Sequence, residues 1–393
     1  MDQPVLTSAA TASGDLDLAG LRRLALAGQV AFLPTGIMTT LLGPMLPILS
    51  ARWTLSDAQA GKFFPIQFLS QLGGVLLSGF MLARVGFRAV FLSGLVLMAA
   101  GASTFFLGSV WVAMFSTAVY GLGLGLIIPT ANLMAAEVST GSRAAAVSLL
   151  NFFWGVGAVL CSVLVAWAAR YQRVPLFLGA VAVSMLVLAV AVRRLPFPGP
   201  RPSGGPSVPW GLIARNPVTW LFAVVFFLYP GAETCVGGWI ASYVSQMGMG
   251  TAAVAAMMPA FFYAAMTAGR GAGGWVLRQL PEQRVLQGGY ALAALGIALL
   301  MRSSTANSVK FSAVLTGLCY ATLYPIAVAR LSHHYGVEAR TVGSLMFSLA
   351  ALGPAALPWL VGVVSQSAGS LRAGLAVPLL STIILLAVHL KKW

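Results

Sequence analysis

One acidic residue stands in the middle of a long apolar segment. Glu233 lies within a run over approximately 218–246, which is long enough to cross a bilayer as a helix. The other seven of the eight Asp and Glu residues fall in the N-terminal stretch or at expected helix ends and loops. A carboxylate at membrane depth is costly and persists where it faces a cavity, a partner charge or a mobile proton. Glu233 is therefore interpreted as a proton- or cation-coupling group, or as a protonated acid hydrogen-bonded to its own helix.

Polar and aromatic side chains near the middle of other apolar runs are candidates for binding a small polar molecule. Gln67 and Gln71 are four residues apart and share one helix face, where a helix–helix hydrogen bond is the alternative role. Asn151 and Trp154 would place an amide beside an aromatic face, which suits a sugar. The full candidate set is Gln67, Gln71, Asn132, Asn151, Trp154, Tyr320 and Tyr324.

Four other residues near the membrane have simpler interpretations. Lys62 is expected to snorkel to the interface, with an anion-attracting role at a cavity mouth as the alternative. Arg270 is expected to pair with helix carbonyls or groups on the cytoplasmic side rather than with Glu233. Trp239 and Trp359 are expected in the interfacial aromatic belt.

The composition defines the class of protein. Hydrophobic residues make up 59% of the 393 positions and charged residues only 8%, with a mean hydropathy of +0.90. Soluble domains carry about 25% charged residues, so this chain is predicted to be a polytopic membrane protein. The net charge of +15 is scattered between apolar runs, which argues against a nucleic-acid partner.

Signals for other functions are missing from the sequence. The three cysteines show no CxxC spacing, and we find no nucleophile–base arrangement and no phosphate-binding glycine loop. No enzyme activity, cofactor or metal is therefore predicted. The first twenty or so residues have no apolar core, so no cleaved signal peptide is expected.

Twelve apolar runs separated by short polar breaks predict twelve transmembrane helices. They cover approximately 25–50, 58–83, 89–107, 110–136, 145–169, 175–192, 218–246, 252–277, 285–301, 309–329, 341–366 and 372–390. With a cytoplasmic N-terminus, fifteen basic residues fall on the cytoplasmic side and only six on the other. The positive-inside rule then places both termini in the cytoplasm, and a bacterial inner membrane is the expected location. The six exceptions are Arg52, Arg170, Arg173, Arg302, Lys310 and Arg372.

A Pro- and Gly-rich segment divides the chain into two similar halves. We expect a cytoplasmic tail over 1–20, a six-helix bundle over 21–195, a cytoplasmic linker over 196–208 and a second bundle over 209–393. An offset of 196 aligns Gly and Pro positions of the two halves, including Pro34 with Pro230, Gly121 with Gly317, and Gly157 with Gly353. Such repeats are typical of transporters whose substrate site lies between the halves.

The loop after the second run carries a family signature. It reads GFMLARVGFR over 79–88 and resembles the cytoplasmic loop motif of the major facilitator superfamily, although Ala83 replaces the acid of that motif. A degenerate second copy covers 274–284. The resemblance implies an all-α fold of two six-helix bundles. It also implies a conformational gating loop at Gly79, Arg84, Gly86 and Arg88.

Two stretches narrow the resemblance within that superfamily. Residues 229–240 and 269–275 are similar to spans seven and eight of the fucose/galactose–proton symporter and sodium-dependent glucose transporter branch. This implies a small polar solute such as a sugar, moved with a proton or sodium. The acids of the fucose carrier's first and fourth spans are absent here, over 36–47 and 121–134, which leaves Glu233 for coupling.

Three functions follow from these features. The first is a monomeric secondary transporter for a small polar solute, working by alternating access of 21–195 against 209–393. In it, Glu233 is the proton- or cation-coupling group or a hydrogen-bond acceptor for substrate hydroxyls. The second is a multidrug or metabolite exporter, a proton antiporter, with Glu233 as counter-charge of its cargo. The third is a membrane receptor that keeps the fold without transport.

Overall fold

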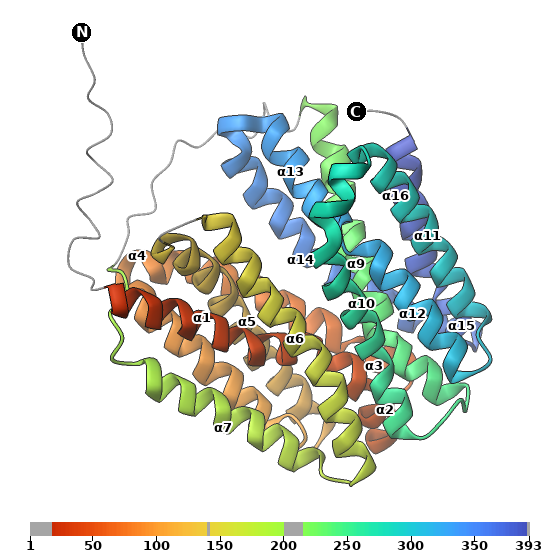
Figure 1. Ribbon diagram of the computed structural model, residues 1–393. Coiled ribbons are helices and arrows are strands. Elements are labelled where there is room, and N and C mark those ends of the chain that lie inside the picture. Colours follow the sequence, from red (N-terminus) through yellow and green to blue (C-terminus); the bar gives the residue numbers. More distant parts are fainter. Residues whose placement is uncertain (1–17, 140–141, 200–214, 391–393) are drawn as a thin grey trace.

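The computed structural model describes residues 18–139, 142–199 and 215–390. The predicted tail and linker lie largely outside these ranges. Every regular element within them is helical, in agreement with the predicted all-α fold. Figure 1 shows two bodies, one coloured red to yellow-green and the other green to blue. We call them the N-terminal half (α1–α7) and the C-terminal half (α9–α16).

The N-terminal half is built from seven helices. Its second predicted span begins after a one-turn helix whose N-cap, Ser56, forms a capping box with Gln59. Its helices are α1 (Leu18–Thr40), α2 (Leu42–Trp53), α3 (Asp57–Gly61), α4 (Phe63–Thr104), α5 (Val110–Val138), α6 (Arg143–Arg170) and α7 (Val174–Val192).

The C-terminal half repeats this pattern with more breaks. Its first helix starts at a capping Asn216 followed by Pro217, a residue suited to the first helical turn. Its elements are α9 (Pro217–Gln246), α10 (Ala252–Gln279), α11 (Glu282–Arg302), α12 (Ala306–Tyr320), α13 (Leu323–Tyr335), the 3₁₀ turn η1 (Gly336–Glu338), α14 (Ala339–Ala368), α15 (Leu371–Gly374) and α16 (Ala376–Leu390).

The described helices account for the predicted twelve spans. Ten are long and apolar enough to cross a membrane, and α1 with α2 form one more span that bends by 42°. The 48-residue stretch Asp57–Thr104 is more than twice the ~20 residues that one crossing needs. It breaks at Gly86, whose φ of 77° and ψ of 175° favour glycine, so it supplies two spans.

Glycine crossings relate the two halves. A Cβ atom on Gly157 of α6 would lie 2.2 Å from the Leu33 carbonyl oxygen of α1. A Cβ on the equivalent Gly353 of α14 would lie 1.9 Å from the Phe227 oxygen of α9. Each half therefore holds its first and fifth spans together by backbone contact that only glycine permits. This agrees with the repeat found in the sequence.

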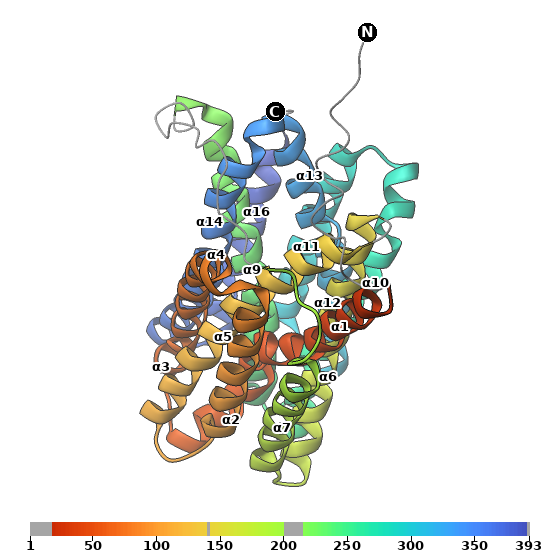
Figure 2. The same cartoon turned by 90° about the vertical axis from the view of Figure 1, so that its left-hand side faces the viewer.

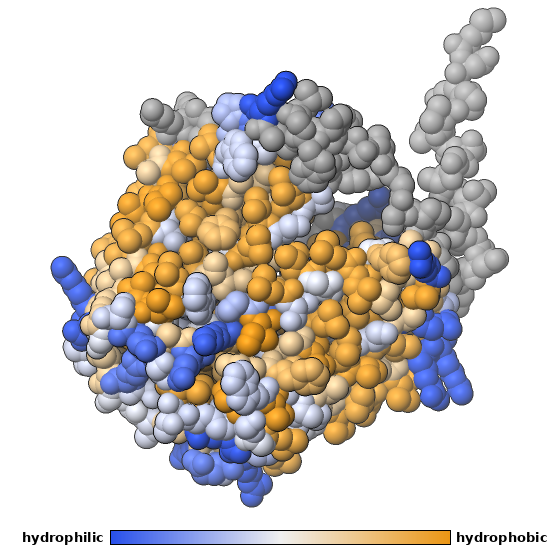
Figure 3. Space-filling view, turned by 180° about the vertical axis from the view of Figure 1, so that it is seen from behind, coloured by the Kyte–Doolittle hydropathy of each residue, from blue (hydrophilic) through white to orange (hydrophobic). Residues whose placement is uncertain are grey.

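The halves touch at one end and in the middle. They meet where α6 packs on α10, α2 on α9 and α10, and α14 on α3 and α4. At the opposite end, on the left of Figure 1, the two bodies separate, and Figure 2 looks into this end. Hydrophobic side chains cover most of the face in Figure 3, as expected of a surface in lipid.

Candidate functional site

Glu233 forms an ion pair inside the C-terminal half. Its Oε2 lies 4.0 Å from Nη2 of Arg270 on the neighbouring helix α10, and the side chains are 17% and 29% exposed. The expectation that Arg270 pairs elsewhere was wrong. From the sequence, Arg270 was placed near one end of its own span, away from the level of Glu233. Because α9 and α10 pack antiparallel, the two side chains nevertheless meet. Each charge lowers the cost of keeping the other at membrane depth.

Trp154 extends this site into the N-terminal half. The Arg270 Cζ lies 5.9 Å from the centre of the Trp154 ring, and the Tyr263 ring meets the same tryptophan edge-on at 6.3 Å. The Trp154 Nε1 donates to Thr39 Oγ1 at 3.4 Å. A chain of contacts thus runs from the carboxylate on α9, through the guanidinium on α10, to α6 and α1.

Two polar atoms at this junction are buried without a hydrogen-bond partner among the described residues. They are Arg270 Nε and Thr267 Oγ1, both on the face of α10 that packs against α6. Gly155 makes this approach possible, since a Cβ there would lie 2.5 Å from Thr267 Oγ1. Buried polar groups are normally hydrogen-bonded, so these two atoms are unsatisfied in this arrangement of the helices.

The other predicted binding residues divide into two groups. Gln67 and Tyr320 are fully buried, and their side chains hydrogen-bond within their own half. Gln67 donates to Thr39 O at 3.0 Å and accepts from Tyr120 at 2.9 Å, whereas the Tyr320 and Thr382 hydroxyls are 2.6 Å apart. These contacts use the polar atoms for helix packing.

The side chains of the second group make fewer contacts with other helices. Asn132 and Asn151 donate to carbonyls one turn back on their own helices. Asn151 is exposed and lies one turn from Trp154. Gln71 Oε1 is buried without a partner among the described residues. Tyr324 stacks on Tyr229, with ring centres 5.6 Å apart, which places it one helical turn from Glu233.

Polar residues that the sequence reasoning missed join the halves at one end. The Asp57 carboxylate on α3 accepts from Gln246 Nε2 of α9 at 2.6 Å and from Ser365 Oγ of α14. Ser56 Oγ donates to Gln366 Oε1 at 2.8 Å. We call this the closed end. The capping-box spacing of Ser56 and Gln59 signalled helix α3, but nothing in the sequence indicated its partners.

Two tryptophans and a lysine lie near this closed end. Trp239 is fully buried, donates to the Pro358 carbonyl at 2.9 Å and meets the Phe64 ring of the other half at 6.1 Å. It seals the contact between halves, so the interfacial-belt prediction for it was wrong. Trp359 is 41% exposed. Lys62 is exposed between α3 and α4, consistent with snorkelling.

The predicted gating loop lies at the break in α4. Gly79 and Arg84 are exposed, and Arg84 covers the Phe80 ring at 4.0 Å. Arg88 Nη2 donates to the Leu195 carbonyl at 3.1 Å, which ties the loop to the end of the N-terminal half.

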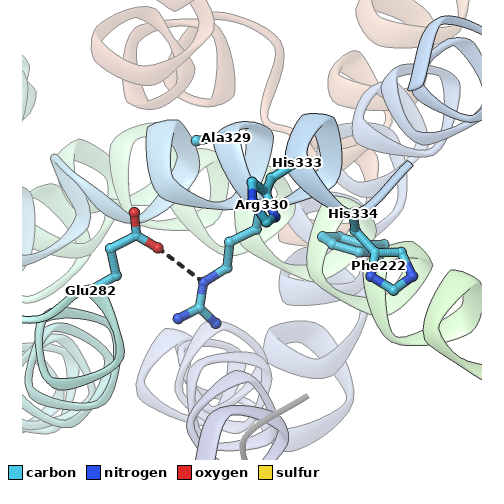
Figure 4. Close-up of a pocket in the computed structure, with 6 residues that line it drawn as sticks. All are labelled: Phe222, Glu282, Ala329, Arg330, His333 and His334. Carbon is cyan, nitrogen blue, oxygen red and sulfur yellow. Dashed lines mark hydrogen bonds and ion pairs between the residues drawn. The ribbon is translucent and has the colours of Figure 1, made fainter. Parts of the chain in front are cut away.

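A separate pocket of about 550 Å³ opens on the C-terminal half (Figure 4). Arg330 of α13 points toward Glu282 of α11, with Nε 3.4 Å from Oε2, and His334 lies beside Phe222 of α9. None of the predicted binding residues lines this pocket. The described residues also contain no group of three metal-binding side chains.

Comparisons with known proteins agree with this arrangement. The profile of the Major Facilitator Superfamily matches residues 30–311, and the chain belongs to that superfamily. It is a multi-pass membrane transporter and not an enzyme.

Two relatives match over most of the chain. An uncharacterised MFS-type transporter of Yersinia pestis is 24% identical over 359 residues, or 90% of this chain and 92% of the relative. The glucose/mannose transporter GlcP of Bacillus subtilis is 24% identical over 357 residues, covering 87% and 88%.

Two solved structures share the fold. A bacterial homologue of the human lysosomal transporter Spinster, inward-facing and unoccupied, has a TM-score of 0.77 at 12% identity, covering 94% of this chain and 96% of that one. The transporter FucP in its outward conformation has a TM-score of 0.64 at 17% identity, covering 94% and 99%.

Proposed function

We propose that this transporter carries a small sugar-like solute by alternating access and couples its movement to a proton through Glu233. The observation that carries the proposal is the Glu233–Arg270 pair, which lies where α10 meets Trp154 of the other half. Relatives named for glucose and mannose, and a fold neighbour that is a fucose carrier, support a sugar. None of the four relatives described above is named an exporter.

The proposed substrate site lies between Trp154, Arg270 and Thr267. An aromatic face packs against the apolar face of a sugar ring, while the unpartnered Arg270 Nε and Thr267 Oγ1 meet its hydroxyl groups. Asn151 and Tyr324 extend the site to either side. Gln71 and Asn132 remain further candidates, whereas Gln67 and Tyr320 are proposed to act through packing.

Coupling follows from the charges. With Glu233 ionised, its carboxylate neutralises Arg270. When Glu233 takes up a proton, Arg270 loses this counter-charge at membrane depth and binds the oxygen atoms of the substrate instead. Release of the proton restores the ion pair and competes with the substrate. Sodium is the alternative coupling cation, and the chain is proposed to work as a monomer.

Alternating access requires the closed end to open. The bodies proposed to rock are residues 21–195 and 209–393, joined by the linker 196–208. Since basic residues favour a cytoplasmic position for both termini, the closed end is proposed to face outward and the opposite end, where the two bodies separate in Figure 1, to face inward. The loop with Gly79, Arg84, Gly86 and Arg88 is proposed to hold the cytoplasmic end when it closes.

The test uses purified protein in proteoliposomes. Labelled glucose, mannose, galactose and fucose are offered with and without an inward proton gradient, and with an inward sodium gradient at equal pH. We expect saturable uptake of at least one sugar, stimulated by the proton gradient. Trp154→Leu should abolish this uptake, whereas the lipid-facing control Trp111→Leu should retain it. The absence of uptake for every sugar, together with flux of cationic dyes, would favour the exporter.

A further inference from the structure

A second pocket lies at the closed end, on the outside of the C-terminal half. Its volume is about 570 Å³, and it is formed by the end of α11, the short helix α15 and the start of α16. Leu295 and Leu299 of α11 and Leu379 of α16 form its apolar walls. Among the described residues, Arg302 and Arg372 supply its charged side chains. It shares no residue with the site around Glu233.

The walls of this pocket face lipid. Leu295 and Leu299 are 50% and 37% exposed, and Leu292, one turn further along α11, is 48% exposed. These residues belong to a span that ends at Arg302. Leu295 lies seven residues before Arg302, about 10 Å along the helix at 1.5 Å per residue. The pocket therefore runs from the level of the lipid headgroups into the apolar layer.

The two arginines have unused hydrogen-bonding capacity. Arg372 donates from Nε to the Tyr243 hydroxyl at 3.3 Å, and its other guanidinium N–H groups have no partner among the described residues. The Arg302 side chain makes no hydrogen bond or ion pair with any described residue, and no acidic residue is among those that line the pocket. A guanidinium carries five N–H donors and binds phosphate well.

The positions of these arginines are also unusual. Both belong to the six basic residues on the side of the membrane that is otherwise poor in positive charge. A helix end can attract one cation through its carbonyl groups. That effect accounts for Arg302 at the end of α11, but it does not explain why a second arginine and an apolar groove converge on the same place.

We propose that this pocket binds a phospholipid with an anionic headgroup. The phosphate is held by Arg302 and Arg372, and the upper part of an acyl chain lies along Leu295, Leu299 and Leu379. Basic pockets beside membrane helices recognise anionic lipids through this combination of charge and apolar wall. Charge complementarity selects an anionic lipid over a zwitterionic one, and the groove selects a lipid over a free anion.

The bound lipid would also support the closed end. The Tyr243 hydroxyl, which accepts from Arg372, lies 3.1 Å from the carbonyl oxygen of Met301 in α11 and 3.1 Å from that of Ser303, which follows this helix. Tyr243 is one helical turn before Gln246, which binds Asp57 of the other half. A headgroup on Arg372 thus holds the end of α9 that carries this contact.

The test measures thermal unfolding of the purified full chain in neutral detergent. Dioleoylphosphatidylglycerol, dioleoylphosphatidylcholine and inorganic phosphate are added separately at equal concentration. We expect the anionic lipid to raise the melting temperature by about 3 °C or more over the zwitterionic lipid. The double variant Arg302→Gln/Arg372→Gln should lose this difference. Native mass spectrometry should show one retained anionic lipid on the wild type.

Matched variants separate the pocket from general surface charge. Arg170→Gln/Arg173→Gln removes two exposed arginines from the same side of the N-terminal half and should retain the selectivity. Arg302→Gln alone leaves the contact between Arg372 and Tyr243 intact and should weaken the selectivity for the anionic lipid. Leu295→Trp fills the groove but keeps both arginines, and it should abolish the lipid selectivity. Leu292→Trp, outside the pocket, should retain this selectivity.

Three results would overturn the proposal. The first is equal stabilisation of the wild type by the two lipids. The second is an equal loss of selectivity in the Arg170/Arg173 control. The third is a shift with inorganic phosphate alone that matches the anionic lipid, which would indicate a simple anion site.

Discussion

The two halves share the same glycine crossings, but only the C-terminal half carries a charged pair in the middle of its spans. Gly157 crosses α1 as Gly353 crosses α9, with a backbone oxygen about 2 Å from the missing Cβ in both cases. The same offset of 196 residues aligns Glu233 with Ile37 and Arg270 with Gly74. Ile37 is buried, and Gly74 packs against the Leu122 backbone. The ion pair of one half is therefore replaced by tight apolar packing in the other.

This comparison separates architecture from chemistry. Backbone contacts at glycine hold the spans of both halves in place, so the repeat conserves shape. The charge pair occurs on one side only, beside the aromatic face that the other half provides through Trp154. Because the charge pair and the aromatic face belong to different halves, the distance between them changes when the halves move relative to each other.

The largest expected effect comes from breaking the shared scaffold. Gly157→Val and Gly353→Val each place side-chain atoms where a carbonyl oxygen now lies. Because the clash is with backbone atoms rather than with a flexible side chain, the two helices must separate to relieve it. We therefore expect loss of most folded protein in both cases. Fluorescence-detected size-exclusion chromatography measures the yield. Gly179→Ala and Gly288→Ala, with no atom within 4 Å of the added Cβ, are the controls and should fold normally.

The next effect comes from removing one charge of the pair. Glu233→Gln leaves Arg270 without its counter-charge, and breaking a buried pair in this way costs about 3–5 kcal/mol, which partial exposure reduces here. We expect a clear drop in melting temperature.

A double variant sharpens the same comparison. Glu233→Ile/Arg270→Gly copies the residues of the N-terminal half, so it should recover part of the lost stability and still fail to transport. A double variant that is no more stable than Glu233→Gln would show that the two side chains do not interact.

A smaller effect is expected at the closed end. Asp57→Asn keeps the shape of the side chain but weakens its bonds to Gln246 and Ser365, each worth about 1.5–3 kcal/mol when one partner is charged. The protein should shift toward the state open at this end. Accessibility of a cysteine introduced at Phe64, measured by maleimide labelling, should rise several-fold on a background without the native cysteines. Glu282→Gln, whose partner Arg330 is in the same half, should leave labelling unchanged.

The smallest effect concerns the aromatic face alone. Trp154→Tyr retains a ring but weakens the cation–π contact with Arg270, which is worth about 0.5–2 kcal/mol. We expect KM to rise two- to tenfold with little change in folding. Initial uptake rates over a range of sugar concentrations provide the measurement. An unchanged KM would remove Trp154 from the substrate site.

Much of the fold could be predicted from the sequence, because the length of an apolar run and the positions of glycines within it can be read without knowing how the helices pack. The twelve runs predicted the spans, and the repeat offset paired Gly157 with Gly353, although it did not show which helices cross at these glycines. Gly86 was expected in a polar break and occupies the one backbone position in α4 with positive φ. Such signals depend on neighbours in the chain and on helix periodicity.

Side-chain partners between helices were harder to predict. Arg270 was misplaced because its distance from Glu233 depends on how α9 and α10 pack, which no local pattern encodes. Trp239 was assigned to the membrane interface from its place in the chain, yet the packing of α9 against α14 and the N-terminal half buries it. Asp57 was expected at a helix end or in a loop, and it is the first residue of α3. Its partners Gln246 and Ser365 could not be predicted, because they come from the distant ends of two other helices.

Glu233 is proposed to carry the coupled proton. Proteoliposomes containing wild type or Glu233→Gln are tested for sugar accumulation under an inward proton gradient and for sugar exchange without a gradient. We predict that Glu233→Gln abolishes gradient-driven accumulation and retains exchange, because the neutral amide mimics the protonated acid but cannot release a proton. Accumulation by Glu233→Gln equal to that of the wild type would contradict the account.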